Sequence, residues 1–151
     1  MKCNVIQQVE WVGDVSFTPA DGGVNVVRDG SVLSRLEEEE DPVVSFTTSS
    51  RPSSDGAEDG VILVTGHKSG LVRQWDLTDR AKPDLVRTFR SIHVGPISVI
   101  RLHHLANGGR VLATGGADGS VKVWDLDHQY YTHNFRTSGN VATVVVFHPT
   151  R

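Results

Sequence analysis

Cysteine is nearly absent from this 151-residue chain, which has Cys3 alone. A single thiol excludes an internal disulfide framework and favours a reducing compartment. The chain is also poor in long apolar runs. The longest, Val141 to Phe147, is far shorter than the roughly 18 residues that cross a membrane, and residues 1–13 have no apolar core of a secretory signal. We therefore expect an intracellular protein that does not bind membranes.

Patterns that carry chemistry are missing as well. The seven histidines and one cysteine show none of the spacings that typically hold a metal ion. Lys68-Ser69 lacks the preceding glycine pattern of a phosphate-binding loop. No pair of carboxylates stands in an apolar context. We predict no metal site, no cofactor, no small-molecule substrate and no enzymatic activity.

Charge is divided unevenly along the chain. Residues 1–60 carry 4 basic and 12 acidic side chains, a net charge of −8, whereas residues 61–151 carry 11 and 6, a net charge of +5. The acidic run from Glu37 to Asp41 is interpreted as a solvated loop that guards a strand edge. The basic second part fits either solvated strand edges or a phosphate-bearing or acidic partner.

What the chain does contain is a near-repeat. Residues 63–77 and 112–126 each place Thr-Gly before a tight turn and end in Trp-Asp-Leu, with Trp75 and Trp124 lying 49 residues apart. A repeat of this size that ends in Trp-Asp indicates a WD-type β-propeller, built of four-stranded antiparallel sheets. With 15 glycines for turns and no apolar period of 3.6, we predict an all-β fold. At about 40–45 residues per blade, the chain holds about three blades, an incomplete propeller.

The repeat predicts how the chain is divided. Residues 1–42 form a degenerate first blade and the acidic loop, 43–91 and 92–138 are WD repeats, and 139–151 begin a further, truncated repeat. Three finer expectations follow. The strand before Val24 is absent or very short, Thr47 to Gly60 is a surface loop, and Val141 to Phe147 is the first strand of a new unit.

Four polar residues of the second repeat resemble the hydrogen-bonded tetrad of WD-repeat blades: His93, Thr114, Asp118 and Trp124. The resemblance implies that the Trp124 indole bonds to Thr114 and that His93 links Thr114 to Asp118. Buried polar groups need such partners, and a complete network makes a blade rigid. The same residue types could suggest a catalytic triad, but the hydroxyl sits inside a strand and no oxyanion donors are implied. We therefore interpret the four residues as structural.

The first repeat matches this pattern in part. Thr65 and Trp75 align with Thr114 and Trp124, while Ser69 stands at the position of Asp118, and no histidine before Val43 fits the pattern. We expect this network to be incomplete and this blade to be the softer one. Lys68 and Arg73 are weak candidates for partner contacts, with a solvated role as the alternative.

Three segments carry a closer resemblance: residues 92–97, 112–126 and 131–149, including Tyr131-Thr132-His133-Asn134-Phe135. They resemble the amino-terminal propeller of the transducin beta-like protein three family, the tandem-propeller WD subunits of the small-subunit processome. The resemblance implies a non-catalytic scaffold in small-ribosomal-subunit biogenesis and pre-rRNA processing, located in the nucleolus. Its partners would be other proteins of a multi-subunit ribonucleoprotein, with contact to small nucleolar RNA or pre-rRNA left open. The alternative is a WD adaptor of a ubiquitin-ligase or signalling complex, because a fold does not determine a function.

Overall fold

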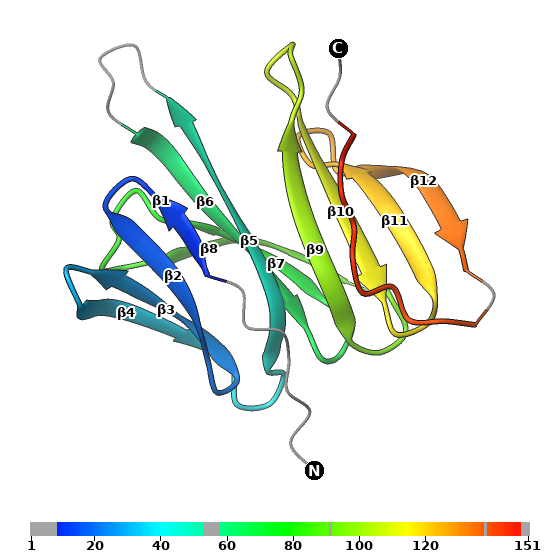
Figure 1. The fold of residues 1–151 in the computed structure, drawn as a ribbon, viewed down its shortest axis with the longest axis horizontal. Helices are drawn as coiled ribbons and strands as arrows, with labels where there is room; N and C mark the ends of the chain where they lie inside the picture. Colours follow the sequence, from blue (N-terminus) through cyan, green and yellow to red (C-terminus); the bar gives the residue numbers. More distant parts are fainter. Residues whose placement is uncertain (1–8, 53–57, 91, 138, 149–151) are drawn as a thin grey trace.

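The computed structural model describes residues 9–52, 58–90, 92–137 and 139–148, which contain strands and no helix. Twelve strands form three separate four-stranded sheets, and neighbours in sequence are antiparallel neighbours in each sheet (Figure 1). The first sheet is β1 (Glu10–Val12), β2 (Val15–Ala20), β3 (Gly23–Arg28) and β4 (Ser31–Glu37). The second is β5 (Val43–Pro52), β6 (Glu58–His67), β7 (Val72–Asp76) and β8 (Asp84–Phe89). The third is β9 (Ile97–His104), β10 (Arg110–Gly116), β11 (Ser120–Asp125) and β12 (Tyr130–Arg136). This confirms the predicted all-β fold of four-stranded antiparallel blades. Within the described residues, no helix could span a membrane.

Two hydrophobic cores lie between the three sheets, one at each interface. The strand β6 contributes to both, because successive side chains point to opposite faces of a sheet. Val61 and Leu63 belong to the core shared with the first sheet, whereas Ile62 and Val64 belong to the core shared with the third. The apolar run in β6 is therefore continuous rather than alternating, as expected for a strand buried on both faces.

The closest backbone contacts between sheets are made by β5 with β1, β3 and β9, and by β6 with β9. The strand β5 packs on β1 and on β9, while β4, β8 and β12 are the outer edges of their sheets. Figure 1 shows the three sheets side by side with β5 and β9 adjacent in the middle. The strands β5 and β9 are thus inner strands, whereas β4, β8 and β12 lie at the outer edges of their sheets.

The first sheet corrects one expectation. The strand before Val24 is not absent: β2 pairs with β3 along its full length, and β1 pairs with Val15 to Phe17 of β2. Pro19 is tolerated because the short β1 does not reach it, so no ladder hydrogen bond from its nitrogen is needed on that side. Val15 and Phe17 are buried in the first core.

The loop predicted from Thr47 to Gly60 is also wrong at both ends. The strands β5 and β6 extend their pairing as far as Pro52 and Glu58, while residues 53–57 lie outside the described part of the chain. The polar residues that suggested a loop are bonded to neighbouring sheets: Thr48 donates to the Glu10 carboxylate, and Ser49 is hydrogen-bonded to His104. Partners in other sheets thus allow polar residues to form an inner strand.

The segment after the third sheet differs from the prediction in another way. Residues 139–148 cross the outward face of the third sheet without forming a strand (Figure 1). The Ser98 hydroxyl donates to the Ala142 carbonyl, and the ring of Phe147 stacks on His103 at 4.9 Å between centroids. Within the described residues no strand pairs with this segment edge to edge, so its backbone joins no ladder.

Candidate functional site

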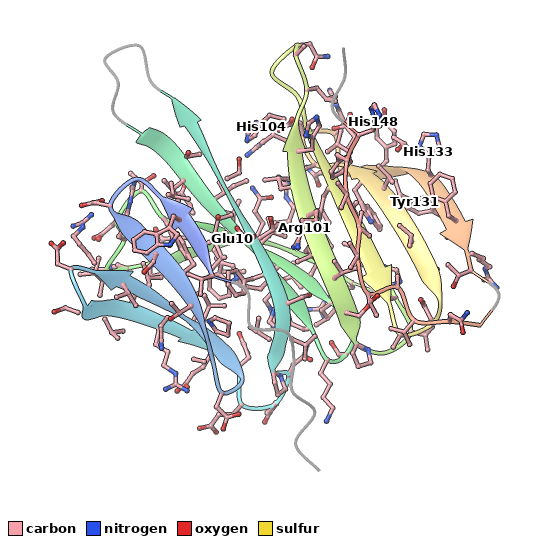
Figure 2. All side chains as sticks on the ribbon, in the orientation of Figure 1. Glu10, Arg101, His104, Tyr131, His133 and His148 are labelled. Atoms are coloured by element: carbon pink, nitrogen blue, oxygen red, sulfur yellow. The ribbon has the colours of Figure 1, made fainter. Side chains whose placement is uncertain are left out.

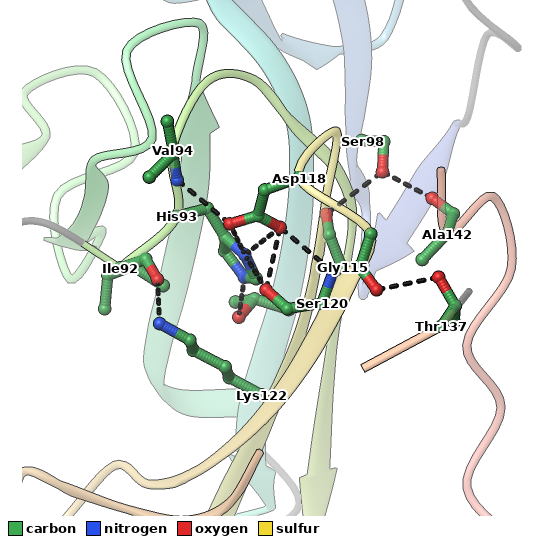
Figure 3. Close-up of polar contacts among 12 residues, drawn as sticks. Ile92, His93, Val94, Ser98, Gly115, Asp118, Ser120, Lys122, Thr137 and Ala142 are labelled. Atoms are coloured by element: carbon green, nitrogen blue, oxygen red, sulfur yellow. Dashed lines mark hydrogen bonds and ion pairs between the residues drawn. The ribbon is translucent and has the colours of Figure 1, made fainter. Parts of the chain in front are cut away.

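The site that the sequence singled out lies in the third sheet, at the end where the connection into β9 meets the turn between β10 and β11. His93 is buried there, with 4% of its surface exposed. Its Nε2 atom lies 2.9 Å from the Thr114 hydroxyl, which also accepts the Trp124 indole N–H at 3.3 Å. Its Nδ1 atom lies 3.1 Å from the Asp118 carboxylate (Figure 3). The structure therefore brings all four predicted residues together.

Asp118 fixes the turn as well as the histidine. Its carboxylate accepts the backbone N–H of Val94 at 3.0 Å, and both the N–H and the hydroxyl of Ser120, at 3.0 and 2.7 Å. Partial burial tends to raise the pKa of Asp118, but these hydrogen bonds, led by the Ser120 hydroxyl, outweigh it and hold that pKa well below its usual range. The carboxylate is thus ionised and accepts only, which places the hydrogen of the His93 ring on Nδ1.

The second sheet holds a network of the same shape. Thr65 accepts the indole N–H of Trp75 at 3.0 Å and lies 2.8 Å from Nε2 of His67, a ring that is fully buried. The Nδ1 atom of His67 lies 2.8 Å from the main-chain carbonyl of Asp41. A carbonyl can only accept, so Nδ1 carries the hydrogen and Nε2 accepts from Thr65. The expectation of an incomplete network is wrong, because the histidine comes from the end of β6 and not from the residues before Val43.

Asp41 takes the acidic position of this second network. Its carboxylate accepts the backbone N–H and the hydroxyl of Ser69, at 2.9 and 2.6 Å. Ser69 stands where Asp118 stands in the sister sheet, and the carboxylate reaches it from the connection before β5. The end of the acidic run is therefore part of the blade, and the interpretation of Glu37 to Asp41 as a purely solvated loop does not hold for Asp41.

Histidine and acid have exchanged places between the two sheets. In the third sheet the histidine precedes the first strand and the acid lies in the turn; in the second sheet the acid precedes the first strand and the histidine ends β6. Gly116 aligns with His67, and the space around Gly116 explains how both arrangements complete their hydrogen-bond network. A side chain at Gly116 would overlap the His93 ring and come within 2.6 Å of the Asp118 carboxylate, so this position is empty where the ring enters from the other side.

Gly70, in the turn between β6 and β7, contacts the backbone of His93 and so connects the turn of the second sheet to the network of the third. Its φ of +94° lies in the left-handed region, and a Cβ there would overlap the carbonyl of His93. The His93 N–H donates to the Gly70 carbonyl at 3.4 Å. The turn of one sheet therefore supports the histidine of the next.

The two candidate contact residues differ in their surroundings. Lys68 is exposed, and its backbone N–H donates to the Pro42 carbonyl at 3.0 Å. The Arg73 side chain is only 15% exposed, and its guanidinium lies 3.3 Å from the His67 ring, 3.7 Å from Glu38 and 4.0 Å from Asp41. Arg73 is engaged inside the network, so the structure does not present it for partner contacts.

Burial decides the charge of both histidines. Desolvation lowers the pKa of His67 and of His93 below the ordinary value of 6.5, and Arg73 beside His67 acts in the same direction. Each ring is therefore neutral near pH 7 and works as a bridge between a hydroxyl and an acceptor. No reacting group is left open by this arrangement, and among the described residues no cluster of three or more His, Cys, Asp or Glu side chains could hold a metal ion.

His67, Asp41 and Ser120 are the members that sequence reasoning missed. A signal existed for His67: the two repeats agree closely except where one has His67 and the other Gly116. A ring in one repeat and no side chain in the other indicates that the same space is filled in two ways. Asp41 had no comparable signal, because it lies inside a run of similar residues.

The described residues form three antiparallel four-stranded blades, and two of these blades each contain a linked Trp, Thr and His. This architecture defines the class of WD-repeat β-propellers. The family model described as WD domain, G-beta repeat, matches residues 84–125, so the chain contains a WD repeat. It is similar to human Transducin beta-like protein 3, with 32% identity over 149 residues that include 94% of this chain. The chain spans 16% of the length of that human protein.

Proposed function

We propose that this chain acts as a non-catalytic scaffold for protein–protein interaction in small-ribosomal-subunit biogenesis, within a nucleolar ribonucleoprotein that processes pre-rRNA. The observation that carries the proposal is the 32% identity to Transducin beta-like protein 3, because it runs through nearly the whole chain rather than through the Trp-Asp segments alone. WD domains mediate interactions between proteins, which supports the role of a scaffold.

The geometry of the two networks supports a scaffold. Each histidine is neutral, buried and bonded on both ring nitrogens, so it has no free lone pair with which to take up a substrate proton. Each network joins the connection before the inner strand of its sheet to the turn between the second and third strands. A rigid end of each blade, with turns held in place, suits the presentation of loops to partner proteins.

The experiment is affinity purification of the tagged chain from the cells that express it, with the tag alone as control. The proposal predicts enrichment of small-subunit pre-rRNA and of nucleolar proteins. Fluorescence microscopy should show the tagged chain in the nucleolus. Treatment of one half of the sample with ribonuclease separates protein contacts, which survive, from contacts bridged by RNA. Recovery of ubiquitin-ligase or signalling subunits in place of nucleolar ones would refute the proposal and favour the adaptor function.

A further inference from the structure

The two interfaces between sheets are built in the same order. The second sheet packs on the first through the face that carries Leu63 and Trp75, and the third packs on the second through the face that carries Leu112 and Trp124. We call the face that meets the preceding sheet the leading face, and the opposite face, which meets the following sheet, the trailing face. Each interface therefore joins a trailing face to a leading face, and the two kinds of face are different surfaces.

The leading face of the first sheet is free, because no described sheet precedes it (Figure 1). Val12 and Val26 belong to the first core, on the trailing face. Since successive side chains of a strand point to opposite faces, their neighbours Trp11 and Val27 stand on the leading face, with Val32 of β4 paired to Val27. Trp11 is 69% exposed and Val32 57%. This face thus presents large apolar side chains to solvent.

The trailing face of the third sheet is free at the other end of the molecule. Because Trp124 points to the second core, Val121 and Val123 point away from it. Their partners on β12 are Phe135 and His133, whose rings are stacked at 5.7 Å between centres. Figure 2 shows His133 at the side of the third sheet that is turned away from the other two sheets. Phe135 is 55% exposed, so this face also presents apolar surface.

Residues 139–148 add to the trailing face of the third sheet. The segment lies against β9, where Ser98 donates to the Ala142 carbonyl, and its Val144 and Val146 side chains are 71% and 81% exposed. The first strand of the first sheet is short by comparison: β1 has three residues, whereas β5 has ten and β9 eight. A face with an added segment is therefore matched by one whose first strand is short.

Charge also favours contact between the two free faces over contact between like faces. Residues 9–42, which form the first sheet and its acidic run, contain nine acidic and two basic side chains, a net charge of −7. Residues 92–148 contain three acidic and four basic side chains, a net charge of +1, and six histidines. Two first sheets would repel each other, whereas a first sheet and a third sheet would not.

We propose that a second copy of this chain docks head to tail, so that the leading face of its first sheet covers the trailing face of the third, and that two copies close into a ring. The contact repeats the order of the two interfaces within the chain. A contact between unlike faces forms either a ring or an open filament, and two copies supply six four-stranded sheets, within the range of about 4–8 blades in propellers. The ring is independent of the partners that the proposed scaffold binds.

Pairing between the outer edges of sheets is the rival form of self-association. The strands β4, β8 and β12 all offer such an edge. Edge pairing uses backbone groups and would leave Trp11 and Phe135 exposed. The two contacts are therefore distinguished by substitutions on the free faces.

The test is sedimentation equilibrium of the purified 151-residue chain over a range of concentrations. The natural chain is expected at twice the 16.5 kDa of one copy. Trp11→Lys places a charge on one free face and Phe135→Glu places a charge on the other. Each should weaken the dimer at least about a hundredfold, because the altered contact occurs twice in the ring. Leu85→Lys is the matched control, since Leu85 is half-exposed on the second sheet, which has both faces packed, and the mass should not change.

Mixing the two variants identifies the faces that meet. In an equimolar mixture, the unaltered third sheet of the Trp11→Lys chain can meet the unaltered first sheet of the Phe135→Glu chain. A dimer with one intact contact should therefore return, weaker than the natural dimer. Val32→Lys and Val144→Glu, at two other exposed positions of the same faces, provide the same comparison if circular dichroism shows that either first variant is unfolded.

A natural chain that stays monomeric overturns the proposal. A dimer that survives in Trp11→Lys alone also overturns it, because like faces or strand edges must then pair. Mixing that fails to restore a dimer would show that the two free faces do not meet. A mass that keeps growing with concentration would show that the contact does not close into a ring of two copies.

Discussion

His67 and His93 are neutral in the fold because burial lowers the pKa of each below 6.5. In the unfolded chain both rings take up a proton as the pH falls through about 6.5. The unfolded state then binds more protons than the folded state, so stability must fall as the pH falls. The slope is expected to reach at most about 1.4 kcal/mol per pH unit for each histidine.

This pH dependence can be measured by chemical denaturation between about pH 7.5 and pH 5. His93→Gln should be less stable at neutral pH but should show a shallower slope than the natural chain. His128→Gln is the comparison: the nearby Asp125 raises the pKa of that exposed ring, so its removal should make the slope steeper rather than shallower. Equal slopes for the His93 variant and the natural chain would contradict the neutral, buried state of this ring. The partly buried Glu10, whose pKa is raised by desolvation, acts in the opposite direction at lower pH.

The exchanged positions of acid and histidine predict unequal costs for removing the two acids. Asp118→Ala removes the group that holds Nδ1 of His93 and the turn, and should lower the free energy of unfolding by about 1–3 kcal/mol. Asp41→Ala should cost less, about 1 kcal/mol or under, because His67 bonds to the main-chain carbonyl, which alanine retains. Urea denaturation of both variants measures this difference. A cost for Asp41→Ala as large as that for Asp118→Ala would show that the carboxylate, not the carbonyl, holds His67.

At the scale of elements, β6 is the strand that joins the two cores. Leu63 is fully buried against the first sheet, so Leu63→Ala should lower the free energy of unfolding by about 2–5 kcal/mol. Leu85→Ala, at a half-exposed position on β8, should change it by about 0.5 kcal/mol or less. The two Trp indoles report where the damage lies: Trp75 packs against the first core and Trp124 against the second. The indole N–H resonance of Trp75 should shift more in Leu63→Ala, and equal shifts would contradict two separate cores.

Elements with local signals could be predicted from the sequence. The hairpins at 63–77 and 112–126 follow from the near-repeat, in which Thr-Gly, a turn that ends in glycine and Trp-Asp-Leu recur in the same order. The strands that were missed depend on other sheets. The short β1 is held by contacts with β2 and β5, and the polar end of β5 is stabilised by Glu10 and His104. The partners of these elements lie 38 and 55 residues away in sequence, so local composition suggested a loop.

The site shows the same limit. Four residues of the network in the third sheet could be named from one repeat, because the pattern there agrees with the tetrad of WD blades. His67 was missed because its repeat places the ring where the sister repeat has Gly116. Its acidic partner comes from a connection whose composition suggested only solvent. An exchange of roles preserves the shape of a network while it removes the sequence pattern.

At the scale of the whole molecule, the sheets are joined through polar contacts between inner strands as well as through the cores. Glu10 of β1 accepts the N–H and the hydroxyl of Thr48 of β5, at 2.6 and 2.5 Å. These bonds tie the first sheet to the second at a strand of only three residues. Thr48→Val keeps the shape of the side chain but removes the hydroxyl, which leaves a partly buried carboxylate with one donor fewer.

Because the two cores are separate, the effect of Thr48→Val should remain local. Amide hydrogens of β1 and β2 should exchange at least about tenfold faster, corresponding to a loss of about 1.4 kcal/mol, while those of β10 and β11 should be unchanged. Thr132→Val is the matched control, since that hydroxyl donates to Val123 within its own sheet at 3.3 Å. Faster exchange in all three sheets would mean that they open as one cooperative unit. Faster exchange that is confined to the first sheet would mean that each interface between sheets has its own stability. This is expected of repeats that mainly contact their neighbours.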